Sequence, residues 1–168
     1  MTGKTHLTAG ALAAVFLVRA EQGEPLLVLS GCVGAALLGS LFPDIDLETS
    51  KLGHAVYPLA KLLNRTVGHR TVFHAPLLYL ALCALLIPQF PRWTPCIVSF
   101  AVGAGTHIGL DALNPAGVPL FWPWKKRVSL ASIDTGRRAE ALLRGLMLLA
   151  IPLCVVAFWV APQLLHIR

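Results

Sequence analysis

Five apolar runs, separated by polar segments, constrain the fold of this chain more than any other feature. They cover residues 7–18, 26–42, 71–87, 96–113 and 139–165. Hydrophobic residues make up 56% of the 168 residues and charged residues only 13%, which is unlike a water-soluble domain. In lipid, a backbone that satisfies its own hydrogen bonds within one segment is a helix. The sequence therefore predicts an all-α, polytopic membrane bundle of about five transmembrane helices, forming a single domain over residues 1–168.

The first run admits two interpretations. One lysine, Lys4, precedes a short apolar core with small residues up to Ala20, which is the pattern of a cleavable signal peptide. The alternative is an uncleaved first helix. His6 at the mouth of the run favours that alternative, because other candidate ligands are expected at the same depth.

Lysine and arginine are distributed unequally between the two sides of the predicted bundle. With a cytoplasmic N-terminus and five alternating spans, eleven of the 14 basic residues lie on the cytoplasmic side. We therefore expect the C-terminus on the opposite side. The net charge of +6 comes without a basic helix face, so no nucleic-acid partner is expected. Nothing in the sequence indicates the oligomeric state.

Two polar segments, 44–70 and 114–138, are expected on the cytoplasmic side. Residues 54–63 are predicted to form a helix at the interface, with Tyr57 and the lysines facing the headgroups. The run Lys125-Lys126-Arg127 is expected to bind anionic headgroups. Membrane lipids are thus the first expected partners.

The sequence Phe-Pro-Asp-Ile-Asp at 42–46 places two carboxylates at the end of the second apolar run. Pro43 stops the preceding helix, because it lacks an N–H and its ring clashes with the helical backbone. Asp44 and Asp46 then lie on a turn at the edge of the hydrocarbon, where ionisable groups are costly and usually functional. The alternative is that the two aspartates only solvate a loop.

Histidine and aspartate residues recur at four predicted helix ends, all on the cytoplasmic side. These candidate metal ligands are His6, Asp44, Asp46, His69, His74, His107 and Asp111. The spacing of four between His107 and Asp111 places both on one helix face. Helix bundles build metal sites from such residues on facing helices, so we predict a metal site here rather than seven unrelated polar groups.

The ligand chemistry is imidazole and carboxylate without thiolate. This set suits zinc, manganese or iron, and it argues against a structural zinc site. The four cysteines lack metal-ligand spacing and are expected to be small buried hydrophobes. Seven candidates exceed the needs of one tetrahedral ion. Either two ions share bridging carboxylates, or some of the seven support the ligands or act as a general base.

Two residues are candidates for catalysis. The general base is expected to be a carboxylate of the ligand set that the metal does not use. Asp46 is a candidate, and the sequence leaves open which carboxylate takes this role. Arg70 could clamp a phosphate with its planar guanidinium and leave the metal untouched. The alternative for Arg70 is a headgroup anchor.

These motifs together resemble the YdjM/YbcI family. The resemblance rests on Thr5-His6, Phe-Pro-Asp-Ile-Asp at 42–46, His69-Arg70 with His74, the segment from Gly103 to Asn114, and Pro-Ala-Gly-Val-Pro-Leu-Phe-Trp-Pro at 115–123. Members are bacterial inner-membrane proteins described as metal-dependent hydrolases, some of them under LexA control. The resemblance implies a multi-pass protein of the inner membrane. The family's helical His/Asp layout is also distantly similar to that of zinc-dependent phospholipase C.

The resulting hypothesis is a membrane-bound, metal-dependent hydrolase, with zinc as the expected metal and manganese as the alternative. A phosphoester of an amphiphilic substrate, such as a phospholipid or an isoprenoid phosphate, is the expected substrate, with amides or peptides next. The alternative is a metal-ion or small-solute transporter that uses the same cluster. A transporter needs polar groups through the bilayer depth, whereas these stop at one face. A structural or regulatory protein would not explain the clustering.

Overall fold

The computed structural model describes residues 1–66, 68, 70–124 and 126–165, and the regular secondary structure in these ranges is helical apart from one β-bridge. The elements are α1 (Gly3–Ala20), α2 (Leu26–Leu41), η1 (Phe42–Asp46), α3 (Lys51–Ala55), α4 (Tyr57–Thr66), η2 (Val72–His74), α5 (Pro76–Gln89), η3 (Pro91–Trp93), α6 (Thr94–Ala112), α7 (Arg138–Val155), η4 (Val156–Val160) and α8 (Ala161–Leu165). Extended pairing in these ranges is limited to one bridge between Val118 and Val128. The predicted all-α class is confirmed.

Among the described residues, two helical stretches are long and apolar enough to cross a membrane. They are Leu26–Asp46, with a mean hydropathy of 2.0, and Arg138–Gln163, with a mean hydropathy of 2.3. α5 is apolar but has only 14 residues. α1 and α6 have 18 and 19 residues, and each contains polar residues of the predicted site. Helix length and composition therefore support two membrane spans, and they do not establish the predicted bundle of five.

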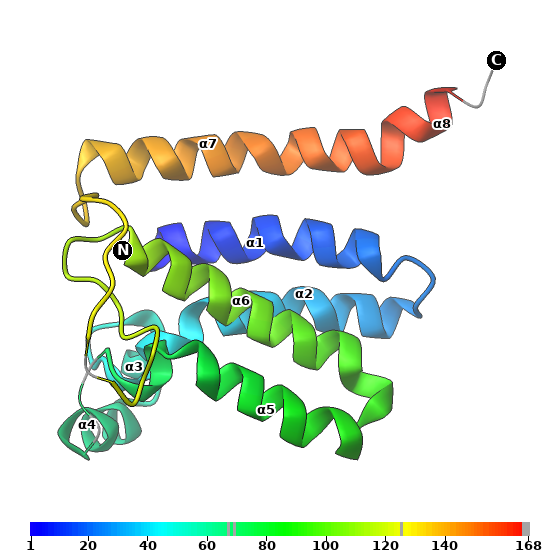
Figure 1. Cartoon of the computed structure of the whole chain (residues 1–168). Helices are drawn as coiled ribbons and strands as arrows, with labels where there is room; N and C mark the ends of the chain where they lie inside the picture. Colours follow the sequence, from blue (N-terminus) through cyan, green and yellow to red (C-terminus); the bar gives the residue numbers. More distant parts are fainter. Residues whose placement is uncertain (67, 69, 125, 166–168) are drawn as a thin grey trace.

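The long helices run side by side in alternating directions (Figure 1). α6 packs against α2, α1 and α5, while α7 packs against α1. As a result, the N-terminus, the C-terminal ends of α2 and α6, and the start of α7 all lie at one end of the bundle (Figure 1). η1, α3 and α4 lie at this same end, which we call the polar end.

Two boundaries differ from the expectations. The predicted helix at 54–63 is split into α3 and α4, because the chain leaves helical geometry at Val56. The third apolar helix starts at Pro76 rather than at residue 71, and the 3-10 turn η2 occupies part of the difference. Pro76 has no N–H to donate, so it suits the first turn of a helix. The expected turn after α2 is confirmed, since η1 holds Asp44 and Asp46 directly beyond the helix end.

Two glycines allow α2 and α6 to approach closely. A Cβ atom at Gly39 would lie 2.1 Å from the carbonyl oxygen of Phe100, and one at Gly103 would lie 2.1 Å from that of Ala36. Only a residue without a side chain fits at either contact, as is common where helices pack in membranes. This contact sets the distance between the two helices one turn away from the polar end.

We predict that Gly39→Ala and Gly103→Ala each lower the midpoint of thermal unfolding in detergent. Overpacking of this kind typically costs about 1–3 kcal/mol. Gly34→Ala in α2 and Gly105→Ala in α6 are matched controls, because a Cβ atom at either position meets nothing within 4 Å. Equal midpoints for the Gly39 and Gly34 variants would contradict the close-approach argument.

Candidate metal centre

Four elements bring imidazole and carboxylate groups together inside the polar end. α1 supplies His6, η1 supplies Asp44, η2 supplies His74, and α6 supplies His107 and Asp111. The three histidines are fully buried, and Asp111 is only 1% exposed. The side chain of Asp44 is 17% exposed, so it forms the open side of the cluster.

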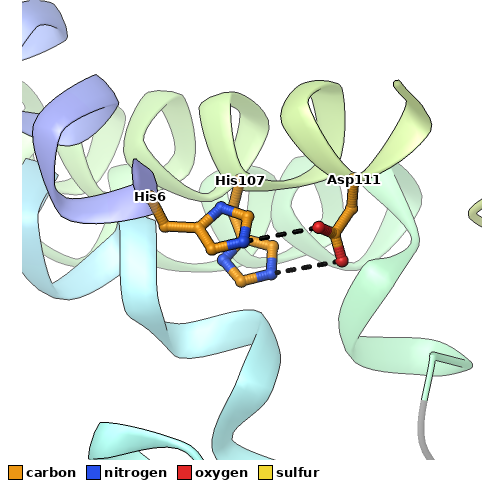
Figure 2. Close-up of side chains that lie close together, drawn as sticks. All are labelled: His6, His107 and Asp111. Atoms are coloured by element: carbon orange, nitrogen blue, oxygen red, sulfur yellow. Dashed lines mark ion pairs between the residues drawn. The ribbon is translucent and has the colours of Figure 1, made fainter. Parts of the chain in front are cut away.

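The ligand atoms form two overlapping groups that share His107. The first group is His6, His107 and Asp111, and the second is Asp44, His74 and His107. His6 Nε2 lies 3.4 Å from Asp111 Oδ1, while His107 Nε2 lies 3.8 Å from Asp111 Oδ2 (Figure 2). His74 Nε2 and His107 Nε2 each lie 3.6 Å from Asp44 Oδ1. Asp111 thus offers its two oxygens to different histidines, as a bridging carboxylate would.

One hydrogen bond fixes the orientation of the shared histidine. His107 Nδ1 lies 2.8 Å from the carbonyl oxygen of Ser40, and only a protonated Nδ1 can donate to a carbonyl. The proton therefore belongs on Nδ1, and Nε2 presents its lone pair to the aspartates. Metal-binding histidines are typically held in this way by a second hydrogen bond. The ring of His6 stacks on that of His107, with centroids 3.6 Å apart and planes 10° apart (Figure 2).

The spacing and chemistry of the cluster fit a divalent ion. Four ligand atoms about 2.0–2.2 Å from a tetrahedral zinc ion are about 3.3–3.6 Å from one another. The N–O distances in the cluster are 3.4–3.8 Å, close to that spacing. Among the described residues, both ring nitrogens of His6 and Nε2 of His107 are buried without a hydrogen bond of acceptable geometry. Such buried polar atoms need a partner, and a cation would supply one.

Two cationic groups of the described residues neutralise Asp111. Arg70 Nη2 lies 2.8 Å from Asp111 Oδ2, and the amino group of Met1 contacts Asp111 Oδ1. Arg70 reaches this position from the left-handed backbone region, with φ of 56°, which is costly for a residue with a side chain. We expected Arg70 to be independent of the metal ligands, and the structure instead pairs it with one of them.

His74 lies in the loop before α5 and faces both carboxylates. Burial lowers the pKa of its imidazole, but the Asp111 and Asp44 carboxylates outweigh burial and raise that pKa above its ordinary value. The carboxylates therefore attract positive charge to this point, whether it arrives as a proton or as a metal ion.

Two predicted ligands are not placed in either group. Asp46 is fully buried at the end of η1, and its carbonyl oxygen accepts a hydrogen bond of 3.0 Å from Asn64 Nδ2. Its carboxylate belongs to neither group of ligand atoms found in the described part of the chain. His69 lies outside the described residues, as does Lys125 of the predicted headgroup-binding run.

Glu140, which no sequence pattern singled out, holds the start of α1 against α7. The Glu140 carboxylate is 2% exposed and accepts hydrogen bonds from the hydroxyl groups of Thr2 and Thr5 and from the backbone N–H groups of Thr2 and Gly136. His6 follows Thr5 directly, so this anchor positions a candidate ligand. The available signal was a lone carboxylate at the start of an apolar run. The Ser40 carbonyl left no such signal, because every residue has one.

The chain belongs to the YdjM family. The model of this family, described as "YdjM inner membrane protein", matches residues 1–165. Inner membrane protein YdjM of Escherichia coli is 34% identical over 152 residues, which span 85% of this chain and 77% of that relative. YvsG of Bacillus subtilis, an uncharacterised protein, is 32% identical over 151 residues, or 88% of this chain and 91% of the relative. No solved structure matches the chain. The protein is an inner membrane protein, as the resemblance implied.

We predict that His107→Ala and Asp111→Ala each lower the metal content of the purified protein, because each removes one ligand atom from the cluster. A loss of about 10-fold or more in affinity is expected, since changing even a supporting partner costs about 10–100-fold. Elemental analysis after dialysis measures the content.

His54→Ala is the control for this prediction, because His54 is exposed on α3, outside both groups. If His54→Ala lowers the metal content as much as His107→Ala does, the cluster is not the metal site.

Proposed function

We propose that this protein is a membrane-bound, metal-dependent hydrolase that cleaves a phosphoester of an amphiphilic substrate. The observation that carries the proposal is the buried imidazole and carboxylate cluster at the polar end, with Asp44 as its open side. Three histidines and two carboxylates without a thiolate are typical of catalytic rather than structural zinc sites. The proposed cofactor is one or two divalent ions, with zinc first and manganese as the alternative.

The ion, when bound, supplies a Lewis acid that activates water and polarises the scissile group. The protein's own residues hold and tune the site. Ser40 holds the tautomer of His107, and Arg70 offsets the negative charge of Asp111. Burial of the three histidines excludes bulk water from all but the Asp44 side.

We assign the general base to Asp46. Asp44 and Asp46 lie on the same 3-10 turn, and only Asp44 belongs to a group of ligand atoms among the described residues. A carboxylate beside the metal can accept a proton from the attacking water. Asp46, two residues from the candidate ligand Asp44 on this turn, is our choice for this role.

The position of the cluster supports an amphiphilic substrate. The buried histidine, aspartate and glutamate side chains of the described residues all belong to the polar end: His6, Asp46, His74, His107, Asp111 and Glu140. The rest of the long helices is apolar, with many exposed leucine and valine side chains. A substrate with an apolar tail could therefore lie along the helices while its polar head reaches the cluster. A transporter would need ionisable groups further along the bundle.

We further propose five membrane crossings with the polar end in the cytoplasm. The alternating directions of α1, α2, α5, α6 and α7 support five crossings (Figure 1). The bias of Lys and Arg supports the orientation, since only Arg19, Arg92 and Arg168 fall on the other side.

We predict that a chelator abolishes phosphoester hydrolysis by the detergent-purified protein and that zinc or manganese restores it. Asp46→Asn should retain metal and lose most of its kcat, because an amide cannot accept the proton. Release of phosphate or of the alcohol from phospholipids, isoprenoid phosphates and aryl phosphates measures turnover. Asp46→Asn with unchanged kcat would remove Asp46 from the mechanism. No turnover on any substrate, together with metal flux in proteoliposomes, would replace the hydrolase by a transporter.

The proposed topology predicts a cytoplasmic N-terminus and polar segment and an external C-terminus. Reporter fusions after Arg168 and within α4 test it directly. A cytoplasmic signal from both fusions would mean an even number of spans between them and would contradict the five-span arrangement.

A further inference from the structure

A cavity of about 450 Å³ opens beside the cluster at the polar end. Its wall is formed by the start of α1, by the segment from η1 to α3, and by α7. Asp44, which belongs to one group of metal-ligand atoms, lines the cavity as well. Any molecule that enters this cavity therefore comes next to the candidate metal centre. Its volume lies in the range of small-molecule sites, about 300–1,000 Å³.

Three basic side chains line the cavity, and they come from three different helices. Lys4 lies on α1, Lys51 on α3 and Arg144 on α7. The Lys51 side chain also lies over the start of α1, with its Cδ atom 3.7 Å from the position of a Cβ atom at Gly3. Residues this far apart in sequence converge on one space only through the fold.

None of these three cations forms an ion pair with another of the described residues. Arg70 differs in this respect, because it is paired with Asp111. A second cavity, of about 580 Å³, is lined by Arg70 together with Arg127. Arg70 is already neutralised by Asp111, so the cavity at Lys51 offers more uncompensated positive charge next to the cluster.

We propose that this cavity is the recognition site for the anionic head of the substrate, a phosphate group carrying two or more negative charges. This inference rests on the proposed function, and it names the substrate class of that same site. Three cations beside a metal centre match a phosphomonoester or a diphosphate better than the single charge of a phosphodiester. Lys4, Lys51 and Arg144 bind the head, and they place the phosphorus next to Asp44 and the metal ligands. Arg70, the sequence-based candidate for phosphate binding, acts instead on Asp111.

The test uses the full-length, metal-loaded protein in detergent and measures two kinds of ligand. Inorganic phosphate is the soluble probe, with its dissociation constant measured by calorimetry. Phosphatidic acid, a lipid phosphomonoester, and phosphatidylglycerol, a phosphodiester, are compared as substrates in mixed micelles. Turnover of phosphatidic acid with phosphate acting only as a weak competitor identifies the lipid as the source of the head. Strong competition or binding by phosphate without turnover of phosphatidic acid identifies a soluble phosphate compound as the source of the head.

Lys4→Ala, Lys51→Ala and Arg144→Ala are each expected to weaken phosphate binding and raise KM by about tenfold, the loss of one charge-assisted hydrogen bond. Their metal content should stay at the wild-type level, because none of them belongs to a ligand group. Lys51→Arg should retain binding, since it keeps the charge. Lys61→Ala is the matched control, because Lys61 lies on α4 over the ring of Tyr57 and not in the cavity.

Wild-type phosphate binding and KM in all three alanine variants would overturn the inference and leave the hydrolase intact. A preference for phosphatidylglycerol over phosphatidic acid would overturn the charge assignment. If the protein hydrolyses nothing but the three variants still bind phosphate more weakly, the recognition site stands and the hydrolase falls.

Discussion

The burial of the Asp111 carboxylate is the constraint on which the rest of this structure depends. Removing a carboxylate from water costs several kcal/mol unless partners compensate it. Here His6 faces one oxygen, and His74, His107 and Arg70 face the other. These partners come from α1, α6 and the loop between α4 and α5, so one buried charge explains why so many chain segments converge at the polar end.

The approach of α2 to α6 connects this charge to the apolar part of the bundle. Gly39 and Gly103 let the two helices approach until the carbonyl oxygen of Ser40 can accept the proton of His107 Nδ1. Ser40 directly follows Gly39, and His107 lies one turn beyond Gly103. Packing along the helices thus determines which nitrogen of His107 faces the aspartates. The geometry of the candidate metal centre therefore depends on small residues outside the polar end.

Much of the site was predictable, because its chemistry is costly in an apolar chain. Histidine and aspartate at the ends of apolar runs stand out, and five of the seven predicted ligands do come together. The sequence could not separate Asp44 from Asp46, because both lie on one 3-10 turn and only the fold decides which carboxylate joins the histidines. It offered Arg70 as a phosphate clamp or a headgroup anchor. The pairing of Arg70 with Asp111, 41 positions away, was not predictable, because it depends on how the loop folds.

The fold was predictable in class and less so in detail. Hydropathy and Pro43 gave the helices and the turn after α2, whereas the break at Val56 and the start of α5 at Pro76 depend on packing at the polar end. Glu140 and the cavity at Lys51 involve residues from helices far apart in the sequence, and no local pattern connects them. Tertiary proximity is the part of the site that a single sequence does not contain.

X-ray absorption spectroscopy at the metal edge of the purified, metal-loaded protein tests the central claim most directly. The account predicts a first shell of nitrogen and oxygen atoms at about 2.0–2.2 Å, with outer-shell scattering from imidazole rings. The four cysteines should contribute nothing, so no sulfur shell at about 2.3 Å is expected. A sulfur shell, or an ion without imidazole scattering, would contradict a metal centre built from His6, His74, His107 and the two aspartates.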